Sequence, residues 1–338
     1  MKVNYFKKDD LDIEFYDKYI RDRIPKKIID MHVHISKNEY MVNAIIDQKS
    51  WASQCNSRME IEDYYDYAKV FYPDSELFIN ALPAVTKGMD IDGNNKYISD
   101  LKSAGKVLFN HMLPDPRWSP EHTEQVLIDG NFDGFKPYPD FVSGARGSEI
   151  GLFEFLTHDQ WSILNEHKKS MVLHLPRAGR FPDDNNINEL KTVREKYPDI
   201  KLIIAHCGRS YSMYYIEETY KKLGSLMNEF YYDLAAVLNP GVLEFMLKHV
   251  SHNLIMYGTD LPIFLWHGRR RWTYTDYFNL VREDFKFNTH EEGAEAEAKY
   301  TFFLYEQLKN ILDTIDKFGD EKLRNKIFYC NAIEMEAK

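Results

Sequence analysis

The sequence IIDMHVHIS at residues 28–36 reads as an apolar strand that ends in two histidines. His32 and His34 stand two positions apart, and side chains at this spacing on a strand point to the same face. Polar residues at 36–38 follow directly, which predicts that the strand ends there. Two imidazoles on one face at a strand end can bind one metal ion, although an HxH pair is by itself a weak signal.

Three more apolar runs end in side chains that bind metals. His174 follows MVL, His206 follows LIIA, and Asp260 follows LIMYGT. In a closed barrel of parallel strands the carboxyl ends of all strands meet at one rim, so we expect these side chains to join the first two histidines. A set of three neutral imidazoles and one carboxylate drawn from these residues would suit one divalent ion, Zn²⁺ first and Mn²⁺ or Fe²⁺ with less preference. The pattern predicts a metal-dependent enzyme.

Short apolar or β-branched runs alternate with stretches of helical periodicity along the chain. Eight such runs lie at 27–34, 76–82, 106–112, 132–137, 170–175, 201–206, 229–236 and 254–260. Several are near-continuous, as in parallel strands that are buried on both faces. Helical periodicity is found between them at 59–71, 149–168, 186–197 and 240–249. This alternation predicts an α/β fold, a (β/α)8 TIM barrel.

The 338 residues exceed the roughly 250 of a plain barrel, which leaves room for additions. We predict one domain over 1–338, with an N-terminal extension at 1–26 and the eight strands within 27–260. A long insertion, rich in Arg, Trp and Phe, begins at 261 as a lid-like loop. C-terminal helices at about 294–318 and 320–336 complete the chain.

Composition is that of an ordinary globular protein, with 44% apolar and 28% charged residues. The net charge of -10 and the pI of about 5.7 lack the basic footprint of proteins that bind nucleic acid or anionic membranes. No apolar run reaches the ~18 residues of a membrane span, and the N-terminus has no apolar signal segment. The three cysteines are widely spaced without a CxxC pair, which predicts a cytoplasmic protein.

Together these motifs resemble the amidohydrolase superfamily, in particular its amidohydrolase-related branch of lactonases, aromatic-acid decarboxylases and other hydrolases. The matching features are the HxH of the first run, the histidines that end the fifth and sixth runs, and the aspartate in YGTDLP. The ending KIFYCNAIEM at 326–335 is similar to the C-terminal helix of that branch. The likeness covers about 28–335 and indicates the superfamily rather than one reaction.

In mononuclear members of this superfamily, four side chains hold the metal. The resemblance implies that these are His32, His34, His174 and Asp260 here. It also implies that His206 polarises or protonates the substrate and that Asp260 takes the proton of the attacking water. A zinc-bound water has a pKa near ~7, and an adjacent carboxylate can accept its proton. If two metals bound, His206 would become a ligand.

Lys136 in GFKPYP ends the fourth run and leaves three interpretations open. Binuclear members of the superfamily carry a carboxylated lysine near this position, which bridges two metals. Members of the mononuclear branch often carry a lysine in a similar Gly-x-Lys context, which suggests a substrate contact. A structural ion pair is the third interpretation. We keep Lys136 as a candidate substrate-binding residue.

Arginines follow three of the ligand-bearing runs. Arg177 and Arg209 each lie three residues after a ligand-type histidine, and the insertion carries three more at 269–271. Arginine binds carboxylates through two parallel hydrogen bonds. We therefore expect Arg177 and Arg209 to bind a small anionic substrate, a carboxylic acid or a lactone. Pairing with nearby acids such as Asp183 and Asp184 is the alternative.

The leading functional hypothesis is a metal-dependent hydrolase that cleaves a lactone, amide or ester through a metal-activated water. The alternative is a metal-dependent non-oxidative decarboxylase of an aromatic or unsaturated carboxylic acid, in which an acid group protonates the carbon. A third hypothesis is a non-catalytic metal-binding barrel, in which four protein ligands would fill the coordination sphere of the ion and leave no position for a substrate. The partners we expect are the small anionic molecule and, from the 14% aromatic content alone, a second copy in a homo-oligomer.

Overall fold

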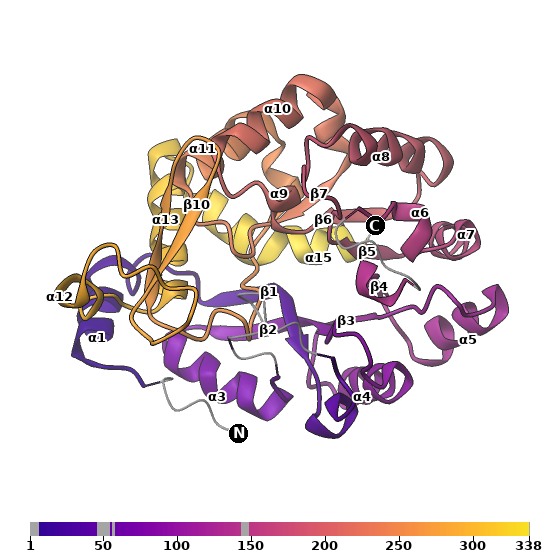
Figure 1. Ribbon diagram of the computed structural model, residues 1–338, viewed down its shortest axis with the longest axis horizontal. Helices are drawn as coiled ribbons and strands as arrows, with labels where there is room; N and C mark the ends of the chain where they lie inside the picture. The colour runs from indigo at the N-terminus through magenta and orange to yellow at the C-terminus, as the bar shows by residue number, and fades with distance from the viewer. Residues whose placement is uncertain (1–6, 46–54, 56–57, 143–148, 338) are drawn as a thin grey trace.

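The computed structural model shown in Figure 1 describes residues 7–45, 55, 58–142 and 149–337. Eight parallel strands form one sheet in the order β1 to β8, each hydrogen-bonded to the next along the chain. Backbone bonds between β1 and the segment after β8 nearly close this sheet: Asp260 N donates to His32 O, and His34 N donates to Leu261 O, both at 2.8 Å. The predicted (β/α)8 barrel is confirmed.

The strands lie at the predicted apolar runs. They are β1 (Lys27–Ile35), β2 (Glu76–Pro83), β3 (Phe109–Met112), β4 (Gly134–Phe135), β5 (Ser170–Leu173), β6 (Lys201–Ile204), β7 (Tyr231–Asp233) and β8 (Ile255–Met256). Their residues are buried almost throughout, because one face lines the barrel and the other packs against helices. Burial on both faces explains why the runs are near-continuous in apolar residues.

Helices surround the sheet in Figure 1. They are α1 (Asp10–Tyr19), α3 (Ile61–Phe71), α4 (Ile91–Ser103), α5 (Pro120–Asp129), α6 (Leu152–Phe155), α7 (His158–Glu166), α8 (Asp184–Lys196), α9 (His206–Arg209), α10 (Met213–Leu223), α11 (Pro240–His249), α12 (Ala294–Glu297), α13 (Phe303–Phe318), α14 (Glu321–Asn325) and α15 (Asn331–Glu336). In the part of the chain that the structure describes, no helix is both long and apolar enough to cross a membrane.

Local signals in the sequence set the helix ends. The predicted helix at 240–249 is α11, where Asn239 caps the first turn and Pro240 occupies its first position. The predicted helix at 149–168 is two helices, α6 and α7. The break arises because Leu156 is extended and Thr157 caps α7 in a reciprocal arrangement with Gln160.

The insertion after β8 has secondary structure of its own. An antiparallel hairpin of β9 (Gly268–Trp272) and β10 (Tyr277–Val281) replaces part of the predicted loop. The N-terminal helix α1 is tied to this region through Asp12, which lies 3.1 Å from Nε2 of His267 and accepts from Phe302 N at 3.0 Å. The N-terminal extension, the insertion and the C-terminal helices therefore contact one another.

Helix α15 closes one end of the barrel. Its Ala332 and Met335 belong to the apolar cluster that fills the barrel interior. Oγ of Ser170, at the start of β5, donates to Glu336 at 2.8 Å, and Asn331 donates to the carbonyl of Ile255 at the start of β8 at 2.7 Å. Because α15 covers the amino ends of the strands, the carboxyl ends are left for a site, as in other barrels of this class.

Candidate metal centre

His32, His34 and Asp260 lie together at the carboxyl ends of the strands. Nε2 of His32 and Nε2 of His34 are each 3.6 Å from Oδ1 of Asp260. One ligand-type atom from each residue lies within 4.8 Å of the others, so the three could hold one ion. Strand β1 presents both histidines on one face, as their spacing predicts, and the backbone bond from Asp260 to His32 keeps the two segments in register.

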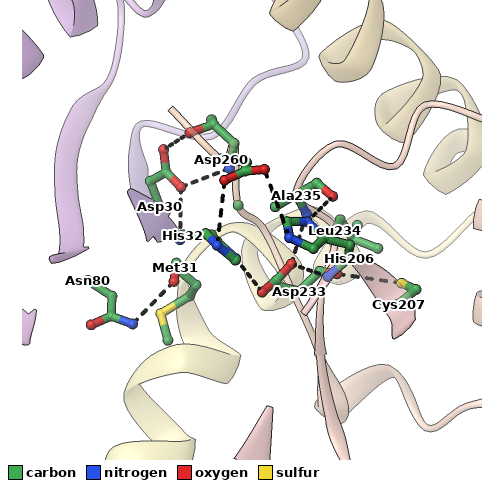
Figure 2. A network of polar contacts seen from close by, with 12 residues as sticks. Asp30, Met31, His32, Asn80, His206, Cys207, Asp233, Leu234, Ala235 and Asp260 are labelled. Carbon is green, nitrogen blue, oxygen red and sulfur yellow. Dashed lines mark hydrogen bonds and ion pairs between the residues drawn. The ribbon is translucent and has the colours of Figure 1, made fainter. Parts of the chain in front are cut away.

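His206 and His174 extend this group along the rim. Nε2 of His206 lies 3.9 Å from Oδ2 of Asp260, and Figure 2 marks contacts from this carboxylate to the rings of His206 and His32. The ring of His174 lies 5.4 Å from that of His206. Among the described residues, no group tight enough to hold an ion includes His174. The structure thus brings three of the four predicted ligands together and places the fourth nearby.

Backbone carbonyls orient two of these imidazoles. Nδ1 of His34 donates to Pro83 O at 2.6 Å, and Nδ1 of His206 donates to Ala235 O at 3.0 Å. A carbonyl can only accept, so Nδ1 carries the proton and Nε2 keeps a lone pair. Burial lowers the pKa of His34 to about 3 and holds the pKa of His206 well below its usual range. Both rings are therefore in the neutral form that binds metals.

Asp233, at the end of β7, fixes the third imidazole. Its Oδ2 is 2.9 Å from Nδ1 of His32, and its Oδ1 accepts from His206 N at 2.8 Å (Figure 2). Nε2 of His32 is buried and has no hydrogen-bond partner among the described residues. Buried ring nitrogens are usually paired, and a carboxylate behind a histidine is the common support of a metal ligand. These donors fit a divalent ion.

Lys136 follows β4 directly and is fully buried beside this group. Its Nζ has no hydrogen-bond partner among the described residues and lies 5.9 Å from the centre of the Tyr138 ring. Burial lowers the pKa of Lys136, while Asp233 and Asp260 raise it. The structural ion pair left open by the sequence is absent from the described residues. A buried ammonium without a partner is costly unless an anion reaches it.

The two predicted substrate-binding arginines differ in their partners. Arg177 makes a two-pronged ion pair with Glu189, at 2.7 and 2.8 Å. The acid pairing considered for it is therefore present, with Glu189 in place of Asp183 or Asp184. Arg209 has no acid partner in the described part of the chain and donates to two backbone carbonyls, at 3.0 and 3.2 Å. Substrate binding by either residue stays a prediction.

Asp30 anchors the segment that carries Asp260. Oδ2 of Asp30 accepts from Oγ1 of Thr259 at 2.6 Å, and Oδ1 accepts from Thr259 N at 3.0 Å and from His32 N at 3.2 Å. Burial raises the pKa of Asp30 to about 7, although these hydrogen bonds by themselves would lower it. Sequence reasoning missed this residue. The usable signal was an acidic residue inside an otherwise apolar run, because a shift in strand register between Asp30 and Val33 means that simple alternation does not place it with the histidines.

A left-handed turn carries His206. All of α9 (His206–Arg209) has positive φ, with values of 55°, 47°, 71° and 63°. This conformation costs about 1–2 kcal/mol for each residue other than glycine. At Gly208 a Cβ would also lie 2.3 Å from the ring of Phe181, so this collision adds to the cost of the positive φ and favours glycine there. Such strain persists where packing imposes it, and it gathers at functional sites.

The barrel resembles several solved structures at low sequence identity. A protein described as a probable 2-pyrone-4,6-dicarboxylic acid hydrolase from Acinetobacter baumannii, with citric acid bound, is 12% identical with a TM-score of 0.55, and the match covers 92% of this chain and 99% of that one. A 5-carboxyvanillate decarboxylase from Novosphingobium aromaticivorans, complexed with manganese and a nitrobenzoic acid, is 13% identical with a TM-score of 0.55, covering 92% and 96%. A 2,6-dihydroxybenzoate decarboxylase from Rhizobium is 11% identical with a TM-score of 0.55, covering 93% and 99%. At such identities the likeness establishes the fold alone.

No curated protein matches this chain. The model of a protein family described as amidohydrolase, however, matches residues 29–335. This range includes almost all of β1, the seven other strands of the barrel and the C-terminal helices as far as Met335. It also agrees with the range over which the sequence motifs resemble that superfamily. The chain therefore belongs to the amidohydrolase family.

Proposed function

We propose that this protein is a metal-dependent hydrolase that acts on a lactone, amide or ester bond of a small anionic molecule. The observation that carries the proposal is the convergence of the Nε2 lone pairs of His32 and His34 on Oδ1 of Asp260, each at 3.6 Å. Lys136 beside them supports an anionic substrate, because its buried ammonium has no hydrogen-bond partner among the described residues.

In this proposal one divalent ion is held by His32, His34 and Asp260, with His174 as the fourth ligand. Zinc is the first candidate, and manganese or iron suits the same donors less well. When bound, such an ion would act as a Lewis acid toward a carbonyl oxygen and lower the pKa of a water. His206 stays outside this ligand set.

The chain's own residues then move the proton. Asp260 takes the proton of the attacking water. Asp260 then carries this proton to the leaving group, and Nε2 of His206 lies 3.9 Å from its Oδ2. Lys136 and Arg209 hold the anionic part of the substrate, whereas the ion pair of Arg177 with Glu189 competes with such a role.

A non-oxidative decarboxylase is the second candidate. The observation that favours it is the burial of Lys136, since an unpaired ammonium at the centre of a site suits a carboxylate that is about to leave. In this reaction an acid group of the site would deliver a proton to the carbon that loses carbon dioxide. Both candidates use the same residues, so the products separate them.

The test combines metal content with product analysis. Protein purified without a His-tag is measured by elemental mass spectrometry, then chelated and reloaded with zinc, manganese or iron. Lactones, esters, amides and aromatic carboxylic acids are screened for acid release and for carbon dioxide. We expect about one ion per chain and metal-dependent hydrolysis. Carbon dioxide without hydrolysis would establish the second candidate in its place.

Two variants locate the ion. His32→Ala should lose the metal, whereas His122→Ala, which changes an exposed histidine at the start of α5, should retain it. If the protein takes up no ion after reloading, or if His32→Ala binds as much as the unchanged chain, the metal centre is assigned wrongly.

A further inference from the structure

Arginines in the described part of the chain mostly pair with acids. Ion pairs hold Arg21, Arg23, Arg117, Arg177, Arg269, Arg271, Arg282 and Arg324. Arg180, Arg209 and Arg270 instead bond only to backbone carbonyls or to an amide among the described residues. In a chain with a net charge of -10, these three arginines, which have no acid partner among the described residues, form a local excess of positive charge, which would attract an anionic ligand.

Arg270, in β9, is the most enclosed of the three, with 4% of its surface exposed. Its Nε donates to Asn279 at 2.9 Å and its Nη1 donates to Ala236 O at 2.7 Å, while Nη2 has no hydrogen bond to a described residue. The rings of Tyr277 and Tyr211 lie 4.5 and 5.1 Å from its guanidinium. Aromatic rings attract a cation but do not neutralise it. A buried guanidinium with a free edge is therefore stabilised when a carboxylate reaches it.

Arg180 lies against the same two rings. Its guanidinium is 5.6 Å from the ring of Tyr211 and 5.5 Å from that of Tyr277, and its Nη1 donates to Arg209 O at 3.5 Å. Two guanidiniums thus share one pair of tyrosines with no carboxylate among the described residues to separate them. Arg180, Arg270, Tyr211 and Tyr277 together are named the arginine–tyrosine cluster.

This cluster borders the metal centre. The ring of Tyr211 lies 6.3 Å from that of His206. Ala236, whose carbonyl receives Arg270, directly follows Ala235, whose carbonyl receives Nδ1 of His206. Figure 1 shows the β9–β10 hairpin next to α13, so the insertion after β8 delivers Arg270 and Tyr277 to the rim of the barrel.

We infer that the arginine–tyrosine cluster binds a second anionic group of the substrate, away from the bond that reacts. The substrate class is then a dicarboxylate or its half-ester or lactone. One carboxyl-derived group lies at the metal centre beside Lys136, and the other accepts hydrogen bonds from Arg270. This inference rests on the proposed function, because it takes the ligand group around Asp260 as the place of reaction.

Calorimetric titration tests this assignment. The probes are phthalate, isophthalate and terephthalate, with benzoate as the monoanion, each titrated into zinc-loaded and into chelated protein. At least one dicarboxylate should bind about 10- to 100-fold more tightly than benzoate, which is the range for hydrogen bonds to a charged group. Arg270→Gln should remove this preference in both forms of the protein. The matched control is Arg271→Gln, since Arg271 is the next residue on the hairpin, exposed and paired with Glu291, and it should leave the preference intact.

Arg180→Gln gives an independent reading if Arg270→Gln does not fold by circular dichroism, because the Arg180 side chain makes a single long hydrogen bond. It should weaken the preference for the dicarboxylate several-fold. The inference is overturned if no dicarboxylate binds more tightly than benzoate, or if the folded variants keep the full preference. If the protein bound no metal and hydrolysed nothing, but still preferred the dicarboxylate through Arg270, the inferred anion site would stand and the proposed function would be refuted. The two failures can therefore be told apart.

Discussion

At the scale of single residues, the candidate centre depends on which ring nitrogen carries the proton. Pro83 O, Ala235 O and Asp233 each face an Nδ1, so the three imidazoles that they hold turn their Nε2 atoms toward Asp260. Burial lowers the pKa of all three rings, which keeps them neutral. The same side chains with protons on Nε2 would repel a cation instead of binding it.

Replacing Asp233 by Asn should therefore weaken metal binding without removing a ligand. The amide would donate to Nδ1 of His32, so the ring proton would move to Nε2 and the lone pair would be lost. We expect the affinity for zinc to fall about 10- to 100-fold, the usual effect of losing such a support. Competition with a chelating dye measures this. Asp199→Asn changes an exposed aspartate and should have no effect.

Replacing Asp260 by Asn should separate binding from chemistry. An amide oxygen can still contact an ion, but it accepts no proton from water. The fold and much of the metal should remain, while turnover falls at least ~100-fold, the lower end for a lost general base. Steady-state kinetics on the substrate found in the product screen checks this. Full activity in this variant would mean that another group takes the proton.

At the scale of elements, the left-handed turn of α9 decides where His206 lies. Phe181 N donates to Gly208 O at 3.1 Å, and Gly208 N donates to Ala205 O at 2.9 Å, so the turn is held from both sides. The turn points the backbone N–H of His206 at Asp233. A regular right-handed turn after β6 would aim the imidazole elsewhere.

Gly208→Ala should destabilise the fold through two effects. The positive φ of +71° costs about 1–2 kcal/mol with a side chain, and the collision with Phe181 at 2.3 Å adds about 1–3 kcal/mol of overpacking. Denaturant unfolding measures the loss. Gly105→Ala is the matched control, because Gly105 has a φ of +68° and open space around its Cβ position, so only the first cost applies. Equal losses in the two variants would show that Phe181 gives way freely.

At the scale of the whole molecule, a buried histidine links the chain's beginning to its end. His267, in the insertion, contacts Asp12 of α1 at 3.1 Å and Glu283 after β10 at 2.6 Å. Asp12 also accepts from Phe302 N, which precedes α13. Burial by itself lowers the pKa of His267, but the hydrogen bonds and charges of Asp12 and Glu283 outweigh burial and raise it. The charged imidazole thus holds three segments together.

This linkage predicts how stability depends on pH. Because the pKa of His267 is raised on folding, its contribution is fully present below the unfolded value of about 6.5 and is lost as pH rises through the folded value. His267→Gln should therefore cost more unfolding free energy at about pH 6 than at about pH 9. His122→Gln, at an exposed histidine, should show no such difference. A larger loss at the higher pH would reverse the sign and refute the linkage.

The local pattern of the sequence was enough to predict the barrel, and physical chemistry explains why. Burial on both faces makes a parallel strand apolar along its whole length, and this is visible in a stretch such as 201–206 without knowledge of its neighbours. The positions of His32, His34, His206 and Asp260 at strand ends followed from the same pattern, because parallel strands end at one rim. Capping residues such as Asn239 likewise act within one turn of their helix.

Only the tertiary structure decided the partners of these side chains. His32 and Asp233 are 201 positions apart, and neither periodicity nor composition relates them. The structure likewise gave Arg177 an acid partner and left Lys136 and Arg270 without one among the described residues. A hydrogen bond or ion pair forms across space between atoms that packing brings within about 3–4 Å. The sequence determined which side chains reach the rim, and their protonation and charge balance were set there by neighbours that packing brought from distant parts of the chain.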